Sequence, residues 1–417
     1  MGGFDTLSFW RDADFRGRMQ WYRGVAANRL PAKFRIAASL SAGIALDAPE
    51  EALWRALDSG AEAFLALRER IRSGEARLPR ERPRPGLLDL AAELARRMLA
   101  HCNFCRWDCR VDRVRGEKLG ACKLAAESRV SSWFHHGGEE LLYRGTHGSG
   151  TIFFTSCNMR CGFCQNGDIS TDRLNGEATS ARLLATMAWL LRAEGCHNVN
   201  WVGGDPTIHL HTILAAIALL PDLEPRREDL AAALGTKADW HVGFTPERSN
   251  AMFEGAFNAP LLWNSNFFMT DEAMKLLRLT IDVWLPDFKF GPGRCALELA
   301  RTGWYWETVT RNLVFLRDWG EDLTIRHLVM PEHVACCTAP VLDWIAAEMP
   351  GAPVNIMDQY HPDNYADPGN AKFMERYRPL ARRPRREEIL AAFRHAKHCG
   401  LRFESLSYER NKTGATL

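Results

Sequence analysis

The sequence predicts an α/β fold: a full or partial (β/α) barrel preceded by an N-terminal helical region and a small cysteine-rich module. Three features lead to this prediction. The first 98 residues carry Ala, Leu and Arg at helical spacing, residues 99–150 hold four cysteines and many glycines, and apolar β-rich runs alternate with helical stretches from Thr151 onward. A chain of 417 residues is long enough for two or three such units. We therefore expect a helical region at 1–98, a cysteine-rich module at 99–150, a barrel at 151–407 and a tail at 408–417.

The composition is that of a globular protein without a strong charge bias. Hydrophobic residues make up 46% and charged residues 25%, which excludes a disordered or fibrous chain. The 53 basic and 51 acidic side chains leave a formal net charge of +2, which argues against a protein that coats a polyanion. The opening MGGFDTLSFWRDADF carries acids and lacks an uninterrupted apolar stretch, and no run long enough to span a membrane follows. We expect a cytoplasmic protein without membrane contact, whose cysteines stay reduced and are available to bind metal.

The N-terminal region contains two amphipathic segments. EALWRALDSGAEAFLALRERI (51–71) and GLLDLAAELARRMLAH (86–101) have helical periodicity, and the Pro-rich basic linker LPRERPRPG (78–86) separates them. We interpret this region as a packing and capping domain.

The barrel is predicted from strands that alternate with helices. The strand candidates are TIFFTS (151–156), HNVNWVG (197–203), WHVGFT (240–245), APLLWNSN (259–266), IDVWLPDF (281–288), DLTIRHLVM (322–330), APVNIMD (352–358) and LRFES (401–405). The helix candidates include SARLLATMAWLLRAEG (180–195), DEAMKLLRL (271–279) and REEILAAFRHAKHCG (386–400). Strands that are apolar on both faces are typical of a parallel sheet covered by helices, in which chemistry takes place at the carboxyl ends of the strands.

A cysteine cluster follows the first barrel strand. SCNMRCGFCQN (156–166) places Cys157, Cys161 and Cys164 in a C-x3-C-x2-C arrangement. Grouped thiolates suit iron–sulfur clusters or zinc. Three cysteines leave one iron of a four-iron cluster open for a substrate or cofactor, whereas a structural zinc ion needs a fourth protein ligand nearby. A zinc knuckle or plain buried thiols are the alternatives.

The C-x3-C-x2-C spacing resembles that of the radical S-adenosylmethionine (SAM) enzymes. In that family the residue before the third cysteine, here Phe163, is aromatic and lies near the adenine. WVGGDPTIH (201–209) follows the second strand and resembles the family's Gly-Gly-Glu-Pro turn at Gly203, Gly204, Asp205 and Pro206. Glycines allow close backbone approach to a ligand, and backbone carbonyls can accept hydrogen bonds from the methionine ammonium group. Asp205 replaces the commoner Glu, so the resemblance implies a role for the backbone of this turn.

The resemblance implies a [4Fe-4S] cluster whose open iron binds the amino and carboxylate groups of SAM. One electron from a reducing partner protein then cleaves the cofactor to methionine and a 5′-deoxyadenosyl radical, which abstracts hydrogen from a substrate. The substrate is either a small molecule or a protein side chain. We do not expect nucleic acid to bind, because the Arg cluster RPLARRPRREE (378–388) lacks aromatic residues for base stacking.

A second cysteine group lies upstream, with the spacing C-x2-C-x3-C-x12-C. Its members are Cys102, Cys105, Cys109 and Cys122. Four thiolates in a short, polar segment can close a metal site that stabilises a module with few apolar residues. Zinc and an auxiliary iron–sulfur cluster are both compatible. His135 and His136 are either an alternative ligand source or part of a surface turn.

The ordered set of motifs resembles one subfamily, the pyruvate formate-lyase activating-enzyme-like radical SAM proteins. The motifs are the four-cysteine module, HGSGTIFFTSCNMRCGFCQN (147–166), WVGGDPT (201–207), NSN (264–266), IDVWLPDFKF (281–290), IRHLVMP (325–331) and MDQYHP (357–362). The resemblance covers about residues 100–405. Established glycyl-radical activases do not share this upstream module, so the substrate does not follow from it. Two alternatives stand beside a radical SAM enzyme of unidentified substrate: an activase acting on a partner protein, and a non-catalytic zinc or iron–sulfur protein with a structural or redox-sensing role.

Polar residues at the strand ends are further candidates, although none is identified as catalytic. Asp282, Asp287, Lys289, Arg326 and His327 stand on or beside apolar strands, where charges need partners. They either contact SAM or the substrate, with the Arg326 fork suited to a carboxylate, or form an internal salt-bridge set. Further candidates to line the pocket are Asn264, Asn266, Gln359 and Tyr360. Five cysteines have no ligand-like grouping beyond the adjacent pair Cys336 and Cys337, and are expected to be small buried hydrophobes: Cys196, Cys295, Cys336, Cys337 and Cys399. A catalytic or hydrogen-donating role for one of them is the alternative.

Overall fold

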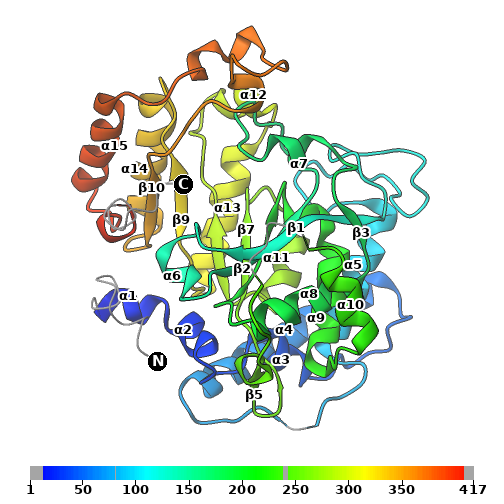
Figure 1. Cartoon of the computed structure of the whole chain (residues 1–417). Coiled ribbons are helices and arrows are strands. Elements are labelled where there is room, and N and C mark those ends of the chain that lie inside the picture. The colour runs from blue at the N-terminus through cyan, green and yellow to red at the C-terminus, as the bar shows by residue number, and fades with distance from the viewer. Residues whose placement is uncertain (1–12, 80, 238–242, 408–417) are drawn as a thin grey trace.

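The computed structural model describes residues 13–79, 81–237 and 243–407 (Figure 1). Its centre is a curved sheet with helices packed around it. The N-terminal helices are α1 (Ala13–Arg18), α2 (Gln20–Ala26), α3 (Lys33–Ala38), α4 (Glu50–Arg72) and α5 (Leu87–Arg97), followed by the 3-10 turn η2 (Met98–His101). Both amphipathic segments predicted in this region are therefore helical.

The parallel strands form a partial barrel. The strands β2 (Ser149–Phe154), β4 (Val199–Gly203), β7 (Leu261–Ser265) and β8 (Val283–Pro286) are hydrogen-bonded in that order, and β9 (Ile325–Leu328) pairs with β10 (Val354–Met357). Two parallel bridges, Trp284 with Leu323 and Asp287 with Arg326, join β8 to β9. Neighbours in space are thus neighbours in sequence, as in a (β/α) barrel that does not close. The predicted fold class is confirmed.

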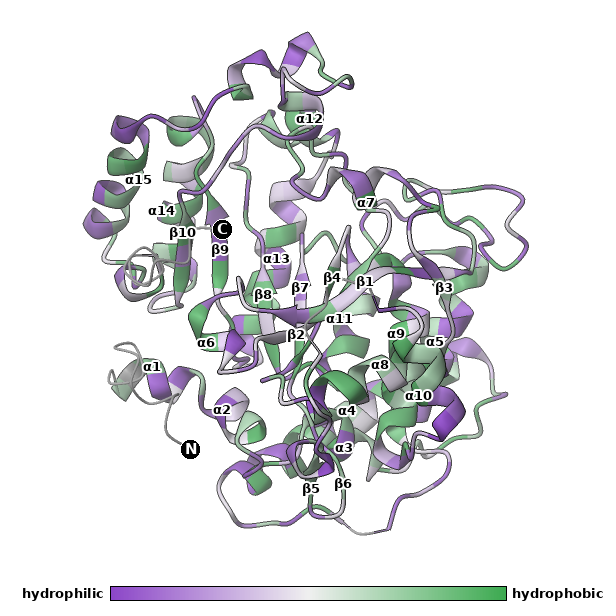
Figure 2. Cartoon of the chain, viewed as in Figure 1, coloured by the Kyte–Doolittle hydropathy of each residue, from purple (hydrophilic) through white to green (hydrophobic). Residues whose placement is uncertain are grey.

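A helix follows each of these strands and covers the outside of the sheet. In order they are α8 (Ala181–Ala193), α9 (Leu210–Leu219), α11 (Asp271–Arg278), α13 (Tyr305–Asp318), α14 (Ala339–Glu348) and α15 (Arg386–His398). Figure 2 shows mainly hydrophobic residues along α8 and α9, whereas hydrophilic and hydrophobic residues alternate on α15. This difference matches their burial, because nine residues of α8 are buried but only three of α15.

The connections contain shorter elements. They are α6 (Leu141–Arg144), α7 (Gly167–Thr171), η3 (Pro206–His209), η4 (Leu220–Asp222), α10 (Arg227–Leu234), η5 (Arg248–Ala251), β5 (Met252–Phe253), β6 (Ala256–Phe257), α12 (Cys295–Ala300), the π-helix η6 (Val334–Thr338), η7 (Asn364–Ala366) and η8 (Glu375–Leu380).

Two antiparallel strands extend the sheet beyond the predicted barrel. The strand β1 (Ser128–His136) pairs with β2, and β3 (Glu177–Thr179) pairs with β1, so the larger sheet has the order β3-β1-β2-β4-β7-β8. Residues 128–136 lie in the segment expected to form the cysteine-rich module. Their strand pairs with the barrel sheet, and its side chains Val130 and Trp133 are buried in the same core.

Two predicted strands differ from the structure. The segment 401–405 forms no strand, and Arg402 makes only one bridge, with Pro353. The reason is that Phe403 turns inward and stacks on Phe393 of α15, with ring centroids 5.6 Å apart. Of the candidate at 240–245, residues 240–242 lie outside the described residues and 243–245 are not in a strand.

The N-terminal helices pack against the amino ends of β8 and β9. The Asp282 carboxylate accepts hydrogen bonds from the Trp21 indole at 2.8 Å and from the Lys33 backbone at 2.9 Å, and the Tyr22 backbone N–H donates to Asp322. These contacts hold the helices at the end of the barrel opposite its carboxyl edge. Among the helices of the described segments, none combines the length and apolar character needed to span a bilayer.

Candidate active site

A cavity of about 360 Å³ lies at the carboxyl ends of the parallel strands. Its lining brings together the cysteine loop after β2, the glycine turn after β4 and the ends of the following strands. The lining residues from these parts include Cys157, Cys161, Phe163, Cys164, Val202, Gly203, Gly204, Asn264, Asn266, Asp287, Lys289, Arg326, Leu328, Met357 and Gln359. Segments up to about 200 residues apart in the sequence therefore meet at the position where a (β/α) barrel carries its chemistry.

The three cysteines after β2 face this cavity on a loop that is held in place on several sides. The backbone N–H groups of Arg160 and Gly162 donate to carbonyls of α12, at 3.0 and 2.8 Å. The Met159 backbone N–H lies 3.3 Å from the Cys157 Sγ, and the Ser170 hydroxyl lies 3.3 Å from the Cys164 Sγ. Burial raises the pKa of all three thiols, and the nearby Lys289 opposes this for Cys161 and Cys164.

The spacing of these thiols tests which metal centre fits them. The three Sγ atoms do not all lie within 4.8 Å of one another. Sulfur ligands of one tetrahedral zinc ion, with Zn–S bonds of about 2.3 Å, are about 3.8 Å apart. A cluster of several irons places its ligating sulfurs farther apart. The three sulfurs are therefore too far apart, as placed, to bind one zinc ion, and three thiolates grouped on one loop also suit an iron–sulfur cluster.

The glycine turn is packed against the base of the cysteine loop. A Cβ atom on Gly204 would lie 1.7 Å from the Ser156 carbonyl oxygen, and Gly203 has φ +126°. The Gly204 N–H donates to Phe154 at 2.7 Å, and the Asp205 N–H donates to Ser156 at 3.0 Å. The sequence motif suggests that the glycines serve ligand approach, and the structure shows that they first allow two backbone segments to touch.

The side chain of Asp205 faces away from the cavity. Its two oxygens accept hydrogen bonds from the backbone N–H groups of Thr207 and Asn266, at 2.9 and 3.0 Å. It thus caps η3, which starts at the buried Pro206, and fixes the end of β7. Of the four residues of this turn, Gly203 and Gly204 line the cavity, whereas Asp205 and Pro206 do not.

Phe163 contributes an aromatic surface to the cavity. Its ring is 3% exposed and packs against Phe290 and Tyr360, with centroids 6.1 and 5.9 Å away. Tyr360 is buried beneath it and donates its hydroxyl to the Leu380 carbonyl. The ring of Phe163 is therefore held in a fixed orientation by two aromatic neighbours.

Comparison with known proteins identifies the family. The model of the radical SAM superfamily matches residues 151–345. An uncharacterized protein of Methanocaldococcus jannaschii, MJ0674, is 34% identical over 323 residues, which cover 76% of this chain and 80% of that protein. The chain belongs to the radical SAM superfamily. It is accordingly an enzyme whose cofactors are a [4Fe-4S] cluster and SAM, and the interpretation as a non-catalytic protein is wrong.

Two solved structures show weaker resemblance to this radical SAM enzyme. SuiB from Streptococcus suis has a TM-score of 0.37 and 11% identity, over 60% of this chain and 46% of SuiB. The structure of anSMEcpe with bound AdoMet has a TM-score of 0.35 and 11% identity, over 63% of this chain and 58% of that one. The chain thus spans less than two thirds of either structure.

An ion network surrounds Asp287 at the end of β8 in the enzyme. Arg326 donates its Nε to Asp287 at 2.8 Å, and the Lys289 ammonium group lies 2.6 Å from the other carboxylate oxygen. Arg326 also donates to the Asn264 side chain. These cationic partners outweigh burial and hold the pKa of Asp287 below its usual range. The predicted salt-bridge set is therefore present, and its members line the cavity at the same time.

Two other predicted polar residues lie outside the cavity lining. Asp282 binds the N-terminal helices at the opposite end of β8. His327 is buried between the Phe288 carbonyl and the Thr338 hydroxyl, at 2.8 and 2.9 Å, and burial lowers its pKa to about 4. Both therefore have structural roles.

Glu139 and Glu140 also line the cavity, although neither is among the residues predicted from the sequence. Glu139 accepts a hydrogen bond from Asn200 at 2.7 Å, Glu140 accepts one from Asn355 at 3.1 Å, and both carboxyls lie within 3.7 Å of Arg326. Burial and the Glu139 charge raise the pKa of Glu140 above its usual range. The HHGGEE segment contains the signal for these residues, but only its histidines are candidates in the sequence.

The four-cysteine module packs directly on the cysteine loop. Three of its thiols are buried, and Cys109 is partly exposed. The backbone N–H of Ala121 lies 3.4 Å from the Cys109 Sγ, and Arg113 lies 3.9 Å from the Cys102 Sγ. No three of these four Sγ atoms, all of them in the described segments, lie within 4.8 Å of one another. His135 and His136 point elsewhere: His135 bonds Glu194, and His136 pairs with Glu139.

Four residues that the sequence leaves ungrouped form another cluster. The possible ligand atoms of Cys295, His333, Cys336 and Cys337 all lie within 4.8 Å of one another. Cys295 and Cys337 are buried as expected, whereas Cys336 is exposed, so the expectation of a buried hydrophobe is wrong for Cys336.

The two remaining cysteines differ from each other. Cys196 is buried as expected. Cys399 is only half-buried, because it lies at the end of α15 with its Sγ 3.4 Å from the Asp343 carboxylate, so the expectation of a buried hydrophobe is wrong for this residue.

Proposed function

We propose that this enzyme holds its [4Fe-4S] cluster through Cys157, Cys161 and Cys164 and binds SAM in the adjoining cavity. The observation that carries this proposal is that the three cysteines, the glycine turn and Phe163 all line one cavity of about 360 Å³. In this assignment the backbone of Gly203 and Gly204 receives the methionine end, and Phe163 lies against the adenine. When bound, the reduced cluster and SAM supply a 5′-deoxyadenosyl radical that abstracts hydrogen from the substrate.

The lining of the cavity combines apolar and charged side chains. Phe163, Leu328 and Met357 line it and would limit access of water to a carbon radical, which reacts with most groups nearby. The Glu139 and Glu140 carboxyls line the same cavity and lie beside Arg326. These groups bind and orient the substrate through its polar atoms. The predicted contact between Arg326 and the SAM carboxylate stays a prediction, because the Arg326 guanidinium group already donates hydrogen bonds to Asp287 and Asn264.

The size of the cavity favours a substrate that inserts a small polar group. Sites for drug-sized ligands have volumes of about 300–1,000 Å³. The cavity of about 360 Å³ lies near the lower end of this range and has to hold both SAM and the reacting part of the substrate. A small metabolite meets this requirement, and so does a short segment of a partner protein.

A glycyl-radical activase is the second candidate. It is supported by the set of motifs that resembles the pyruvate formate-lyase activating-enzyme-like proteins, and by the small space left for a substrate. In this case a backbone glycine of a partner protein would enter the cavity. A glycyl-radical signal in electron paramagnetic resonance, after addition of a candidate partner with SAM and reductant, would support it. Absence of the signal with partners that bind would contradict it.

We also propose that Cys102, Cys105, Cys109 and Cys122 hold an auxiliary iron–sulfur cluster rather than zinc. The supporting observation is again the spacing, because no three of these described sulfurs come within 4.8 Å of one another. Four ligands around one zinc ion would be about 3.8 Å apart. A reducing partner protein would supply electrons to the enzyme.

The main proposal is tested by anaerobic reconstitution with iron and sulfide. Reduction in the presence of SAM is expected to release 5′-deoxyadenosine, measured by chromatography. The Cys161→Ser variant should lose about four irons per chain and all cleavage. The matched control is Cys196→Ser, which replaces a buried cysteine outside the three ligand groups and should keep both. Cleavage that survives in Cys161→Ser would contradict the assignment.

A further inference from the structure

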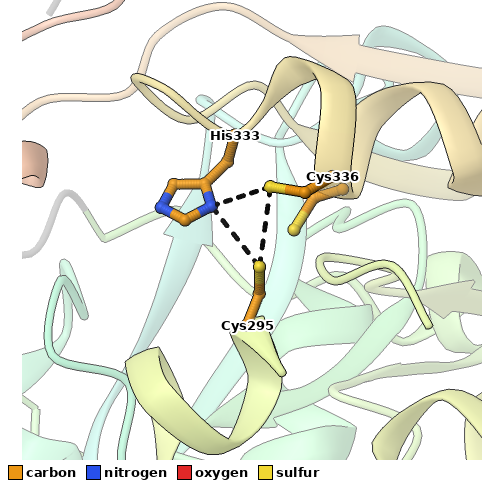
Figure 3. Close-up of side chains that lie close together, drawn as sticks. Cys295, His333 and Cys336 are labelled. Carbon is orange, nitrogen blue, oxygen red and sulfur yellow. Dashed lines mark hydrogen bonds between the residues drawn. The ribbon is translucent and has the colours of Figure 1, made fainter. Parts of the chain in front are cut away.

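A compact set of metal ligands joins two neighbouring loops at the carboxyl edge of the barrel. Figure 3 shows Cys295, at the start of α12, pointing toward His333 and Cys336. The Cys295 Sγ lies 3.5 Å from the His333 Nδ1 and 3.6 Å from the Cys336 Sγ, and the latter two atoms are 3.2 Å apart. Cys337 completes a group of four within 4.8 Å.

The local backbone is shaped to present these ligands. Residues Val334–Thr338 form a π-helix, in which the Thr338 N–H donates to the His333 carbonyl at 3.2 Å. Single π-turns are rare in proteins overall, and those that occur are often at functional sites. The Thr338 hydroxyl bonds the buried His327 of β9, which fixes the turn to the barrel. The wider π-turn brings the adjacent Cys336 and Cys337 into the same group as His333.

The distances match a single tetrahedral ion. Zinc bonds of about 2.3 Å to sulfur and about 2.0 Å to nitrogen give ligand separations of about 3.8 Å between sulfurs and about 3.5 Å between sulfur and nitrogen. The separations here are 3.6 Å for the sulfur pair and 3.2 and 3.5 Å for the sulfur–nitrogen pairs. The other two cysteine groups of this chain are wider. We propose that Cys295, His333, Cys336 and Cys337 bind one structural zinc ion.

The position of this site gives the ion a mechanical role. Cys295 begins α12, and the Leu299 and Ala300 carbonyls near the end of the same short helix accept hydrogen bonds from Gly162 and Arg160. These two donors belong to the loop that carries Cys157, Cys161 and Cys164. The zinc ion fixes α12 to the π-helix and thereby braces the cysteine loop.

Metal analysis of the anaerobically purified protein tests the site. About one zinc ion per chain is expected, and Cys295→Ser and Cys337→Ser should each lower zinc about tenfold after treatment with a chelator. Cys196→Ser should keep the zinc. X-ray absorption at the zinc edge, which is blind to iron, is expected to show three sulfur ligands and one nitrogen ligand. These readouts do not require SAM cleavage, so they succeed or fail independently of the function proposed above.

Two results would overturn the zinc site. One is loss of iron rather than zinc in Cys295→Ser, which would indicate an auxiliary iron–sulfur cluster. The other is a disulfide between Cys295 and Cys336 in protein without zinc, detected by mass spectrometry.

The bracing role is tested separately by hydrogen exchange. Cys295→Ser should speed exchange of the Gly162 amide, whereas Cys196→Ser should leave it unchanged. Unchanged exchange in a zinc-depleted Cys295→Ser protein would show that the ion does not support the loop.

Discussion

The hydroxyl of Ser156 donates a buried hydrogen bond of 2.6 Å to the main-chain carbonyl of Cys122. Ser156 directly precedes Cys157, the first cysteine of the three-cysteine loop, and Cys122 is the last cysteine of the four-cysteine module. Arg160 makes a second link by donating to the Ala121 carbonyl. The two cysteine groups are therefore parts of one packed unit.

This bond makes the Ser156 hydroxyl important for stability. Ser156→Ala leaves the buried Cys122 carbonyl without this donor, and we expect a loss of about 1–3 kcal/mol in the free energy of unfolding. Anaerobic urea unfolding measures it. Ser73→Ala, which removes an exposed hydroxyl at the end of α4, is the control and should change little. Equal stability of Ser156→Ala and the parent protein would show that the bond does not join the two groups.

Gly204→Ala should disturb the cluster loop without touching a cysteine. The new Cβ would lie 1.7 Å from the Ser156 carbonyl oxygen, so the two backbone segments must separate. We expect a loss of about 1–3 kcal/mol or more in stability and a lower iron content per chain. Gly303→Ala serves as the control, because no atom lies within 4 Å of the position that its new methyl group would take. Full iron content in Gly204→Ala would contradict the close approach.

The ion network around Asp287 predicts strong coupling between two side chains. Arg326→Met leaves Asp287 and the Glu139–Glu140 pair with less positive charge, and a loss of about 3–5 kcal/mol in the free energy of unfolding is expected. Asp287→Asn combined with Arg326→Met should cost less than the sum of the single changes. A double-mutant cycle in urea measures this coupling. Additive losses would mean that the pair does not interact.

The stability of the enzyme should depend on the protonation of Glu140. Burial, reinforced by the Glu139 charge, raises the pKa of Glu140 from 4.5 to about 8. Because the folded-state pKa is the higher one, the stabilising contribution is complete below about pH 4.5 and is lost as the pH rises through about 8. Glutamine cannot ionise and so keeps the neutral form at every pH. The melting temperature of Glu140→Gln should therefore rise relative to that of the parent protein as the pH increases from 5 to 8. Thermal scans at steps of about one pH unit measure this difference.

The control for this pH series is Glu62→Gln, which replaces an exposed carboxylate on α4. The gain in melting temperature of Glu140→Gln should exceed that of this control. A difference between Glu140→Gln and the parent protein that does not change with pH would contradict the raised pKa of Glu140.

Iron counting distinguishes the two metals considered for the four-cysteine module. With clusters at both iron–sulfur sites, the reconstituted chain should bind about eight irons, and Cys109→Ser should lose about half of them. Zinc content should not change in this variant. Loss of one zinc ion at constant iron would instead assign zinc to the module.

Periodicity predicts most helices and strands correctly but not the full sheet. The helix α4 has buried Leu53, Leu57, Phe64 and Ile71 on one face, so its pattern is visible in the sequence. The strand β1 escapes prediction, because its segment SRVSSWFHH is only partly buried and follows the glycine-bearing cysteine module. The run at 401–405 has strand-like composition, but the packing of Phe403 on α15 overrides it.

The three-cysteine and four-cysteine groups are visible in the sequence because their ligands lie close together along the chain. The Cys295 group is not visible in the sequence, since Cys295 and His333 are 38 positions apart. Parallel pairing of β8 with β9 brings their following loops side by side and closes that distance. Glu139 and Glu140 reach the cavity only because β1 pairs with β2.

The α/β class, the two local cysteine groups and the glycine turn can be predicted from the sequence, since each depends on residues close together in the chain. Only the folded chain shows which polar side chains meet in the cavity, that Arg326 is paired with Asp287, and that three cysteines and a histidine converge beside α12. The physical reason is that parallel strand order sets which loops become neighbours, and contacts between loops leave no periodic trace in the sequence.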